Sequence, residues 1–402
     1  MGTVMAEVAS LSGVCLGLVG PLPPARGGIT LYVQRLAERL CAAGARVVVL
    51  ATSEGREVGP GVIVRPVRSG RLLVVDVAAA IVQEGIDLVH FHTFGGYWKD
   101  MLPFALLRRM SGVPVVVSQH SIREDLVAMP RRDRQLTAMC VRELSMVLAS
   151  GPTVRDKLLA VGAPAERVVL LTPFIAPQAP QLELVDWPKQ FAELRPIARP
   201  LVVSGTGRLV AVGGRDLYGL DVFVHAAKKV LDQLPNAGFA YVIAHTGDAS
   251  LLQVGLDYVR DRGLQDRVLI LVSDLPAHAV WAAGDIAVRP TLDDGDAVSI
   301  REAMHLGVPC IASDAVGRPP GCATYRTADA DELARAIVAM AGDLPAARAV
   351  VAAHRPSEAV TELIGLYRQI LQQQSRIAKL AATALRRAPL GMGRKAHQPP
   401  VH

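Results

Sequence analysis

The chain has 402 residues, 51% hydrophobic and 20% charged, which is enough apolar sequence for a globular protein of two or three domains. The formal net charge is +6, but the part beyond residue 375 holds six basic residues and no acid, so residues 1–375 are electrically balanced. Since only 4% of the residues are aromatic as well, the composition argues against a nucleic-acid partner.

The cysteines and the apolar runs indicate where the protein works. The five cysteines are widely spaced and lie mostly in apolar runs, which fits neither a disulfide framework nor a zinc site. No apolar run approaches the roughly 20 residues of a membrane span, and no charged flank precedes an apolar segment at the N-terminus. We therefore expect a cytoplasmic protein in a reducing compartment.

In residues 1–175, strand-like and helix-like segments alternate, which is the pattern of a parallel sheet with helices on both faces. The expected strands lie at residues 14–19, 46–51, 62–67, 87–92, 113–120, 146–150 and 167–171. The expected helices lie at residues 29–43, 74–84, 98–110, 134–145 and 153–161. In the first of these helices, Leu31, Leu36, Ala37 and Leu40 share one side. The pattern predicts an α/β domain of the Rossmann-like type.

Residues 176–200 are rich in proline and predict a linker. A second alternating set predicts another Rossmann-like domain over residues 201–350. Its expected strands lie at residues 209–212, 240–244, 268–272, 286–289 and 308–312, and its expected helices at 220–233, 249–262, 276–283 and 298–306.

An amphipathic helix is expected over residues 355–375, followed by a basic tail at 376–402. This tail has two interpretations. It is either a short basic helix on anionic lipid, which would bring the protein to the inner face of a membrane, or a disordered solubilising segment.

The most informative segment is DGDAVSIREAMHLGVPCIASD, in which Asp294 precedes a predicted helix start and Glu302 lies inside the helix. The free amide groups and the dipole of a helix start attract anions, so a phosphate is expected near Val298 and Ser299. The two acids are eight residues apart, too far to share one proton, but they are spaced to hold hydroxyl groups on either side of a phosphate. A nucleotide diphosphate sugar has this order of groups. The alternative is an ordinary loop and helix whose acids are solvated.

Further candidates lie at the ends of predicted strands. Gly27 and Gly28 follow the first strand, where the backbone of glycine can approach an anion. His120 ends another strand, the position where open α/β sheets bind ligands, although a bond to a neighbouring loop is the alternative. His90 and His92 are interpreted as structural residues on opposite faces of their strand, with His92 nearer to the cleft.

The segment beginning at Asp294 resembles the acidic E-x7-E element of retaining GT-B glycosyltransferases of family 4, with Glu302 in the second acidic place. The run GGITLYVQRLAERLCAAGARVVVLA resembles the first loop and helix of that family, whose glycines lie near the donor diphosphate. The resemblance implies a GT-B fold, in which two Rossmann-like domains face a cleft and a C-terminal helix crosses back. It also implies a nucleotide diphosphate sugar as donor, retention, and an acceptor that is a glycan or lipid-linked, as in cell-envelope polysaccharide synthesis. It implies no cofactor and no metal ion. Asp293 and Asp294 are adjacent acids, however, so binding of a metal ion remains an open alternative.

The resemblance also implies roles for particular residues. Glu302 would bind the ribose diol, Asp294 would lie near the sugar hydroxyls, and His120 would lie close to the transferred sugar. Arg215, in VAVGGRDLYGLD, matches the arginine that meets the donor phosphates in the family.

The chain departs from the family pattern in three places. Tyr218 stands where a lysine is usual, so a phosphate-neutralising cation is missing and only a hydrogen bond replaces it. Asp294 stands in place of a glutamate. The segment GRPPG at 317–321 stands where the family often has a diglycine loop and a further glutamate. Arg289 and Arg318 are expected to restore the missing positive charge.

Two alternatives come from other functional classes. A catalytically silent subunit or binding protein of the same fold would explain the missing lysine and the altered acid. A dinucleotide oxidoreductase also has tandem Rossmann domains, but it requires GxGxxG after a strand, and the first strand is followed by GPLPPARGG instead.

Overall fold

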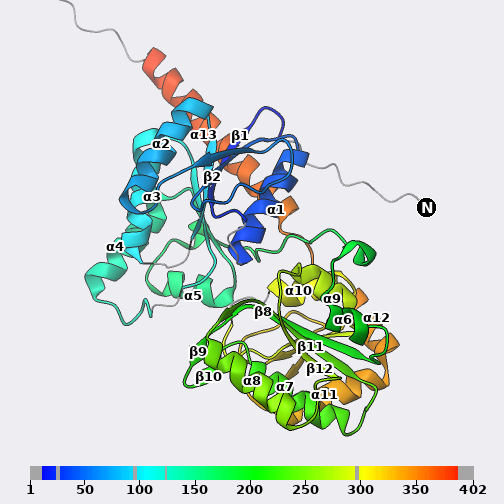
Figure 1. The fold of residues 1–402 in the computed structure, drawn as a ribbon. Coiled ribbons are helices and arrows are strands. Elements are labelled where there is room, and N and C mark those ends of the chain that lie inside the picture. The colour runs from blue at the N-terminus through cyan, green and yellow to red at the C-terminus, as the bar shows by residue number, and fades with distance from the viewer. Residues whose placement is uncertain (1–10, 24–27, 94–96, 123–124, 295–297, 388–402) are drawn as a thin grey trace, which may run out of the picture.

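The computed structural model describes residues 11–387 except 24–27, 94–96, 123–124 and 295–297. It contains two α/β domains, one built on a seven-stranded sheet and the other on a six-stranded sheet (Figure 1). Neighbouring strands within both sheets are parallel. The predicted pair of Rossmann-like domains is therefore confirmed.

The N-terminal sheet has the order β3-β2-β1-β4-β5-β6-β7. Its strands are β1 Cys15–Gly20, β2 Arg46–Ala51, β3 Ile63–Pro66, β4 Leu88–Thr93, β5 Val115–Gln119, β6 Met146–Ala149 and β7 Val168–Leu170. Its helices are α1 Gly28–Ala42, α2 Leu73–Glu84, α3 Trp98–Ser111, α4 Arg131–Glu143 and α5 Pro152–Ala160. The inner strands read as continuous apolar runs because helices cover both faces of the sheet.

The C-terminal sheet has the order β12-β11-β8-β13-β14-β15, with a separate two-stranded hairpin of β9 and β10. The strands are β8 Leu201–Leu209, β9 Ala211–Val212, β10 Arg215–Asp216, β11 Gly238–Gly247, β12 Val268–Val272, β13 Ile286–Arg289, β14 Cys310–Ser313 and β15 Ala323–Tyr325. The helices are α6 Lys189–Leu194, α7 Leu220–Leu231, α8 Ala249–Asp261, α9 Ala277–Ala283, α10 Val298–His305, α11 Ala330–Gly342 and α12 Leu344–Ala353. Helix α6 lies in the expected linker, and its buried residues Phe191 and Leu194 pack into this domain.

The expected first strand of this domain, at residues 209–212, was wrong. The central strand is β8, which ends where that segment begins, and the segment itself contributes to the hairpin. Small and polar residues in LVVSGTGRL conceal the strand from a search for apolar runs. One of them is required by packing, because a Cβ at Gly205 would lie 2.9 Å from the carbonyl oxygen of Val242 on the neighbouring strand.

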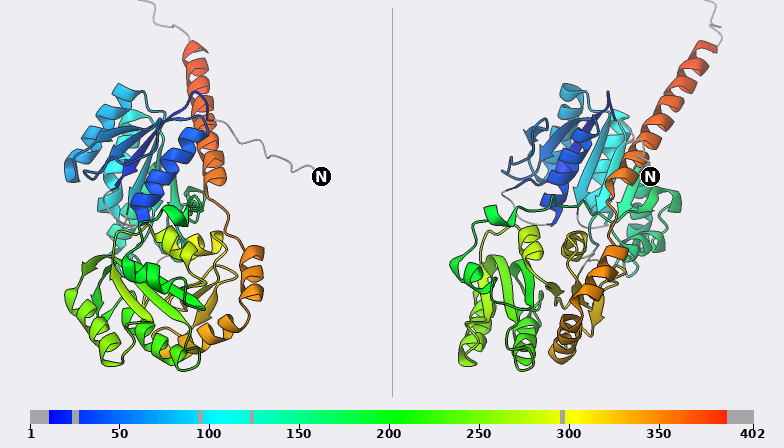
Figure 2. Two further views of the ribbon diagram at one scale, coloured as in Figure 1. Left: turned by 45° about the vertical axis from the view of Figure 1, so that its right-hand side comes forward. Right: turned by 90° about the vertical axis from the view of Figure 1, so that its right-hand side faces the viewer.

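The chain returns to the N-terminal domain in helix α13, Val360–Arg387. Leu363 and Tyr367 of this helix are fully buried in the same apolar cluster as α1, and Figure 2 shows the first part of α13 running along that domain and its end projecting beyond it. The crossover expected at residues 355–375 starts later and continues into the segment that was interpreted as a tail. The rest of that segment, 388–402, lies outside the described residues.

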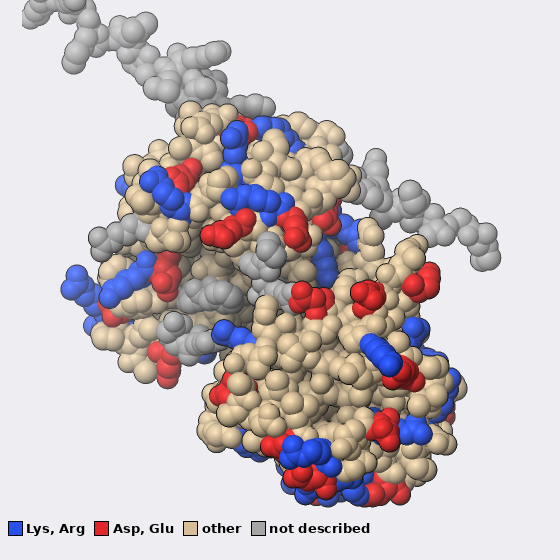
Figure 3. All heavy atoms as spheres, in the orientation of Figure 1, with Lys and Arg blue, Asp and Glu red and all other residues tan. Residues whose placement is uncertain are grey.

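The visible surface carries charges of both signs. On the face seen in Figure 3, positive and negative side chains are interspersed over both domains, as the balanced sequence of residues 1–375 predicts.

In the described part of the chain, no single helix has the length and apolar character to cross a membrane. The bent pair α11 and α12 meets that test together, by length and composition alone.

Candidate functional site

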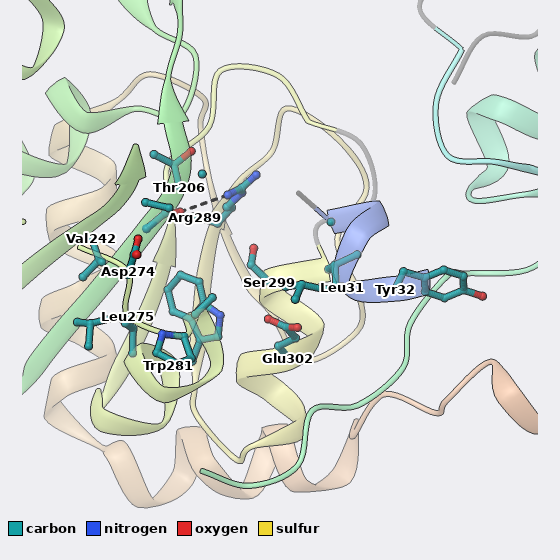
Figure 4. Close-up of a pocket in the computed structure, with 18 of the residues that line it drawn as sticks. Leu31, Tyr32, Thr206, Val242, Asp274, Leu275, Trp281, Arg289, Ser299 and Glu302 are labelled. Carbon is teal, nitrogen blue, oxygen red and sulfur yellow. Dashed lines mark hydrogen bonds between the residues drawn. The ribbon is translucent and has the colours of Figure 1, made fainter. Parts of the chain in front are cut away.

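A cavity of about 710 Å³ lies between the two domains. The N-terminal domain contributes the start of α1 and neighbouring loops, and the C-terminal domain contributes β8, β11, β13, α9 and α10. Figure 4 shows side chains from these elements converging on the cavity. Parallel α/β sheets bind ligands at the carboxyl ends of their strands, and this cavity meets the ends of β8 and β13.

The structure brings most of the predicted site residues to this cavity. Those that line it are Gly28, Tyr218, Arg289, Asp294, Val298, Ser299 and Glu302. Arg215 and His120 do not line it. Gly27 lies outside the described residues.

Helix α10 presents its first turn to the cavity. It is anchored by Ile300, Ala303 and Met304, which are buried in the apolar cluster beneath the sheet. Ser299 and Glu302 are one turn apart on the opposite, cavity-facing side. The Ser299 hydroxyl oxygen is buried and has no hydrogen-bond partner among the described residues. A polar ligand that reaches the start of this helix therefore finds a hydroxyl ready to bind it.

Glu302 forms an ion pair that crosses from one domain to the other. Arg35 on α1 donates from Nη1 to Glu302 Oε1 at 2.5 Å, and the same nitrogen donates to the carbonyl oxygen of Ile175 at 3.2 Å. The Glu302 side chain is only 5% exposed and that of Arg35 15%. The sequence analysis did not identify Arg35, although it lines the cavity.

Asp294 is held between two arginines. Arg289 donates to both carboxylate oxygens at 3.1 and 3.2 Å, and Arg318 donates to Oδ2 at 3.0 Å. Arg318 is further fixed by Ser313, through the backbone oxygen at 2.8 Å and the side-chain oxygen at 3.0 Å. Burial raises the pKa of the Asp294 carboxyl, but the two arginines outweigh it and hold this pKa below its usual value. The two arginines that were expected to replace a missing cation therefore both bind Asp294.

These three side chains still carry a net positive charge, since two guanidinium groups share one carboxylate. Arg289 also lies 5.2 Å from the centre of the Tyr218 ring, in a cation–π contact, and both residues line the cavity. The wall formed by Tyr218 and Arg289 is consequently suited to an anion.

The turn after Tyr218 depends on glycine. Gly219 has a φ of 75°, and a Cβ there would lie 1.8 Å from the carbonyl oxygen of Pro290. We expect Gly219→Ala to lower the free energy of unfolding by about 1–3 kcal/mol more than Gly214→Ala. Gly214 is the matched control because its φ is also positive, at 79°, but nothing lies within 4 Å of its added Cβ. Urea unfolding of the two variants measures the difference, and equal losses would contradict the assignment of the close contact.

Arg215 is placed differently from its predicted role. Its guanidinium binds Asp221 in the first turn of α7, at 2.8 Å from Nε and 2.7 Å from Nη2. It belongs to the short hairpin β9–β10 and does not line the cavity. The predicted contact of Arg215 with the donor phosphates therefore stays a prediction, since in this structure its guanidinium is engaged by Asp221.

His120 belongs to a cluster of three histidines in the N-terminal domain. Its Nε2 lies 3.3 Å from His92 Nδ1, and its ring meets the Tyr32 ring edge-on at 5.5 Å. His90 is bonded on both sides, to the hydroxyls of Tyr367 at 2.5 Å and Ser118 at 2.8 Å. Tyr32 lines the cavity and stands against the cluster, whereas His120 does not reach the cavity.

The expectation that His90 and His92 face opposite sides of their strand was wrong. Alternate residues of a strand point to the same face, and the two rings lie 4.2 Å apart. Burial lowers the pKa of His90 to about 3 and that of His120 to about 4, and it holds the pKa of His92 well below the usual value. All three imidazoles are therefore neutral near pH 7.

Some cavity residues had a signal in the sequence that the analysis did not use. Gly28, Leu31, Tyr32 and Arg35 recur at spacings of three and four, so they form one stripe of α1, and all four line the cavity. Leu31, which was grouped with Leu36 and Leu40 on one side of the helix, is 37% exposed and belongs to this stripe instead. Trp281 of α9, whose buried indole nitrogen has no partner among the described residues, had no such signal.

Metal binding has no obvious location in the described residues. No group of three or more His, Cys, Asp or Glu side chains there is arranged to hold an ion. The adjacent acids Asp293 and Asp294 are linked instead by a hydrogen bond, from the backbone nitrogen of the second to the side chain of the first, at 2.9 Å.

Comparison with known proteins gives two family matches, one in each domain. Residues 26–179 match the model described as Glycosyltransferase Family 4, and residues 206–343 match the model described as Glycosyl transferases group 1. A D-inositol 3-phosphate glycosyltransferase of Thermomonospora curvata is 26% identical, over 79% of this chain and 81% of that protein.

Solved structures share the fold at low sequence identity. Anabaena HepE in complex with UDP-glucose has a TM-score of 0.59 and 19% identity, over 90% of this chain and 99% of that one. The catalytic domain of starch synthase IV from Arabidopsis thaliana, bound to ADP and acarbose, has a TM-score of 0.65 and 13% identity, over 90% and 99% of the two chains. A glycosyltransferase from Rickettsia africae has a TM-score of 0.67 and 14% identity, over 89% and 99%. The two family models and the shared fold place this chain among the GT-B glycosyltransferases of the family 4 and group 1 models.

Proposed function

We propose that this glycosyltransferase moves a sugar from a nucleotide diphosphate sugar to an acceptor hydroxyl with retention of the anomeric configuration. The observation that carries the proposal is the interdomain cavity, in which the start of α10 with the unpartnered Ser299 hydroxyl lies one turn from the Glu302 carboxylate. The solved complexes of HepE with UDP-glucose and of starch synthase IV with ADP support a nucleotide as ligand. Nothing in the comparisons favours a catalytically silent subunit.

We propose that the diphosphate and the ribose of the donor lie one after the other along the cavity. Its diphosphate would lie at the first amide groups of α10, near Val298 and Ser299, where the helix dipole is positive. The net positive charge of the two arginines at Asp294 would add to that attraction. The ribose diol would donate to Glu302, because a buried carboxylate is an acceptor for two neighbouring hydroxyls. Arg215 and His120 are not included in this site.

The proposed reaction needs no side chain to hold a covalent intermediate. The acceptor hydroxyl, of a glycan or a lipid-linked molecule, attacks the anomeric carbon on the same side as the departing diphosphate. The bond from that carbon to the phosphate oxygen breaks, and the phosphate oxygen takes the proton of the hydroxyl. The cations and amide groups around the diphosphate stabilise the negative charge that develops there.

Titration with UDP-glucose, GDP-glucose and ADP-glucose tests which nucleotide sugar the protein binds. A transfer assay then uses the nucleotide sugar that binds. We expect at least one to bind, and Glu302→Gln to weaken that binding roughly 10- to 100-fold, since a hydrogen bond to a charged group is lost. Glu193→Gln is the control, because Glu193 is an exposed acid on α6 that pairs with Lys189 and does not line the cavity. Absence of binding by all nucleotide sugars tested, or unchanged affinity in Glu302→Gln, would contradict the proposal.

A further inference from the structure

We propose that Arg35 is a positioning residue for nucleotide recognition: it fixes one oxygen of Glu302 from the opposite domain, so that the other oxygen accepts from the ribose diol. This inference rests on the proposed function and adds to it a residue of the N-terminal domain. It also implies that the ribose site is complete only when both domains are in place.

The geometry around Arg35 is that of a fixed support. Its Nη1 contacts Glu302 Oε1 at 2.5 Å and the backbone oxygen of Ile175 at 3.2 Å. Ile175 lies in the segment that leads out of the N-terminal domain, so the guanidinium is tied to α1 and to this segment at once. Because the backbone oxygen of Ile175 also accepts from this nitrogen, the guanidinium has less freedom to follow a moving carboxylate. It therefore determines the orientation of the Glu302 side chain.

The burial of Glu302 explains why such a support is needed. A carboxylate that is only 5% exposed is strongly disfavoured in its charged form unless a cation accompanies it. Arg35 is the cation that contacts it, through Oε1, while Oε2 has no hydrogen-bond partner in the described part of the chain. Without Arg35 the carboxylate would lose its cation and would be free to turn toward solvent, which removes the acceptor that the diol requires.

A second arginine on the same helix provides a matched comparison. Arg39 follows Arg35 by one helical turn and pairs with Glu358 at 3.1 Å, where the chain crosses back between the domains. The Arg39 side chain is 42% exposed and does not line the cavity. Arg39→Gln removes the same charge from the same helix without touching Glu302.

The experiment measures the affinity of the full chain for UDP, GDP and ADP, and for the 2′,3′-dideoxy form of whichever of them binds. The ratio of the two affinities reports recognition of the diol alone. We expect a ratio of roughly 10 to 100 in the wild-type protein. Arg35→Gln should bring this ratio close to one, as should Glu302→Gln, and the double variant should lose no more than Glu302→Gln alone. Arg39→Gln should leave the ratio unchanged.

Other outcomes would overturn the inference. A wild-type ratio retained in Arg35→Gln would show that Glu302 is positioned without the arginine, and tighter nucleotide binding by Arg35→Gln would show that the arginine competes with the ribose. Arg35→Lys keeps the charge and is expected to recover part of the ratio, which covers the case in which Arg35→Gln does not fold. Failure of the wild-type protein to bind any of the three nucleotides would overturn the proposed function itself, whereas binding with an unaltered ratio would overturn this inference alone.

Discussion

Asp294→Ala is expected to lower the free energy of unfolding by about 3–5 kcal/mol, because it leaves two buried arginines without their carboxylate. The Arg318 side chain is 2% exposed and that of Arg289 13%, so Arg318 in particular would be left as a buried charge without a carboxylate. The Asp294 carboxylate would then stabilise the fold, in addition to any contact that it makes with a sugar. Urea unfolding followed by circular dichroism measures the change.

A second substitution separates charge burial from simple loss of packing. Adding Arg318→Met to Asp294→Ala removes one of the two uncompensated charges, and we expect it to recover part of the stability rather than to lower it further. Purely additive losses in the double variant would show that the carboxylate and Arg318 act independently. Asp293→Ala is the matched control, because Asp293 has no contact with either arginine among its hydrogen bonds in the described residues.

The stability of the protein is also expected to fall as the pH is lowered from 7.5 to 5. Burial lowers the pKa of His90 from its ordinary value of 6.5 to about 3 and holds the pKa of His92 well below 6.5. Below pH 6.5 the unfolded chain therefore binds protons that the folded chain does not, and the free energy of unfolding decreases with falling pH. At pH 5 His90 alone costs about 2 kcal/mol, and His92 adds to this loss in the same direction.

Urea midpoints at intervals of pH measure this loss, and proton uptake on unfolding at pH 5.5 provides an independent readout. Two variants identify its origin. His92→Gln should reduce the slope of stability against pH, and His225→Gln, at an exposed histidine of α7, should leave it unchanged. A stability that stays constant or rises between pH 7.5 and 5 would contradict a neutral, buried histidine cluster. His120, with its pKa lowered to about 4, and His278 and His305, also lowered mainly by burial, act in the same direction.

Local patterns in the sequence were sufficient for most of the elements. The apolar strands β1, β2 and β6 and the helix α10 were found close to their observed bounds, because continuous apolar runs and a helical period are properties of neighbouring residues. Strand β8 was missed since its glycine and polar residues are explained by the approach of the neighbouring strand, which no local pattern contains.

The cavity residues also differ in whether local sequence patterns or only the tertiary structure explains them. The sequence alone determined that the chain is a pair of Rossmann-like domains and that Asp294 and Glu302 flank a helix start, since both depend on short-range spacing. The tertiary structure decided what those acids contact: Asp294 lies between Arg289 and Arg318, and Glu302 meets an arginine that is 267 positions away in the chain. The first set of contacts depends on how strands and loops assemble within the C-terminal domain, and the second on how the two domains pack against each other. Residue spacing within a segment carries no information about either.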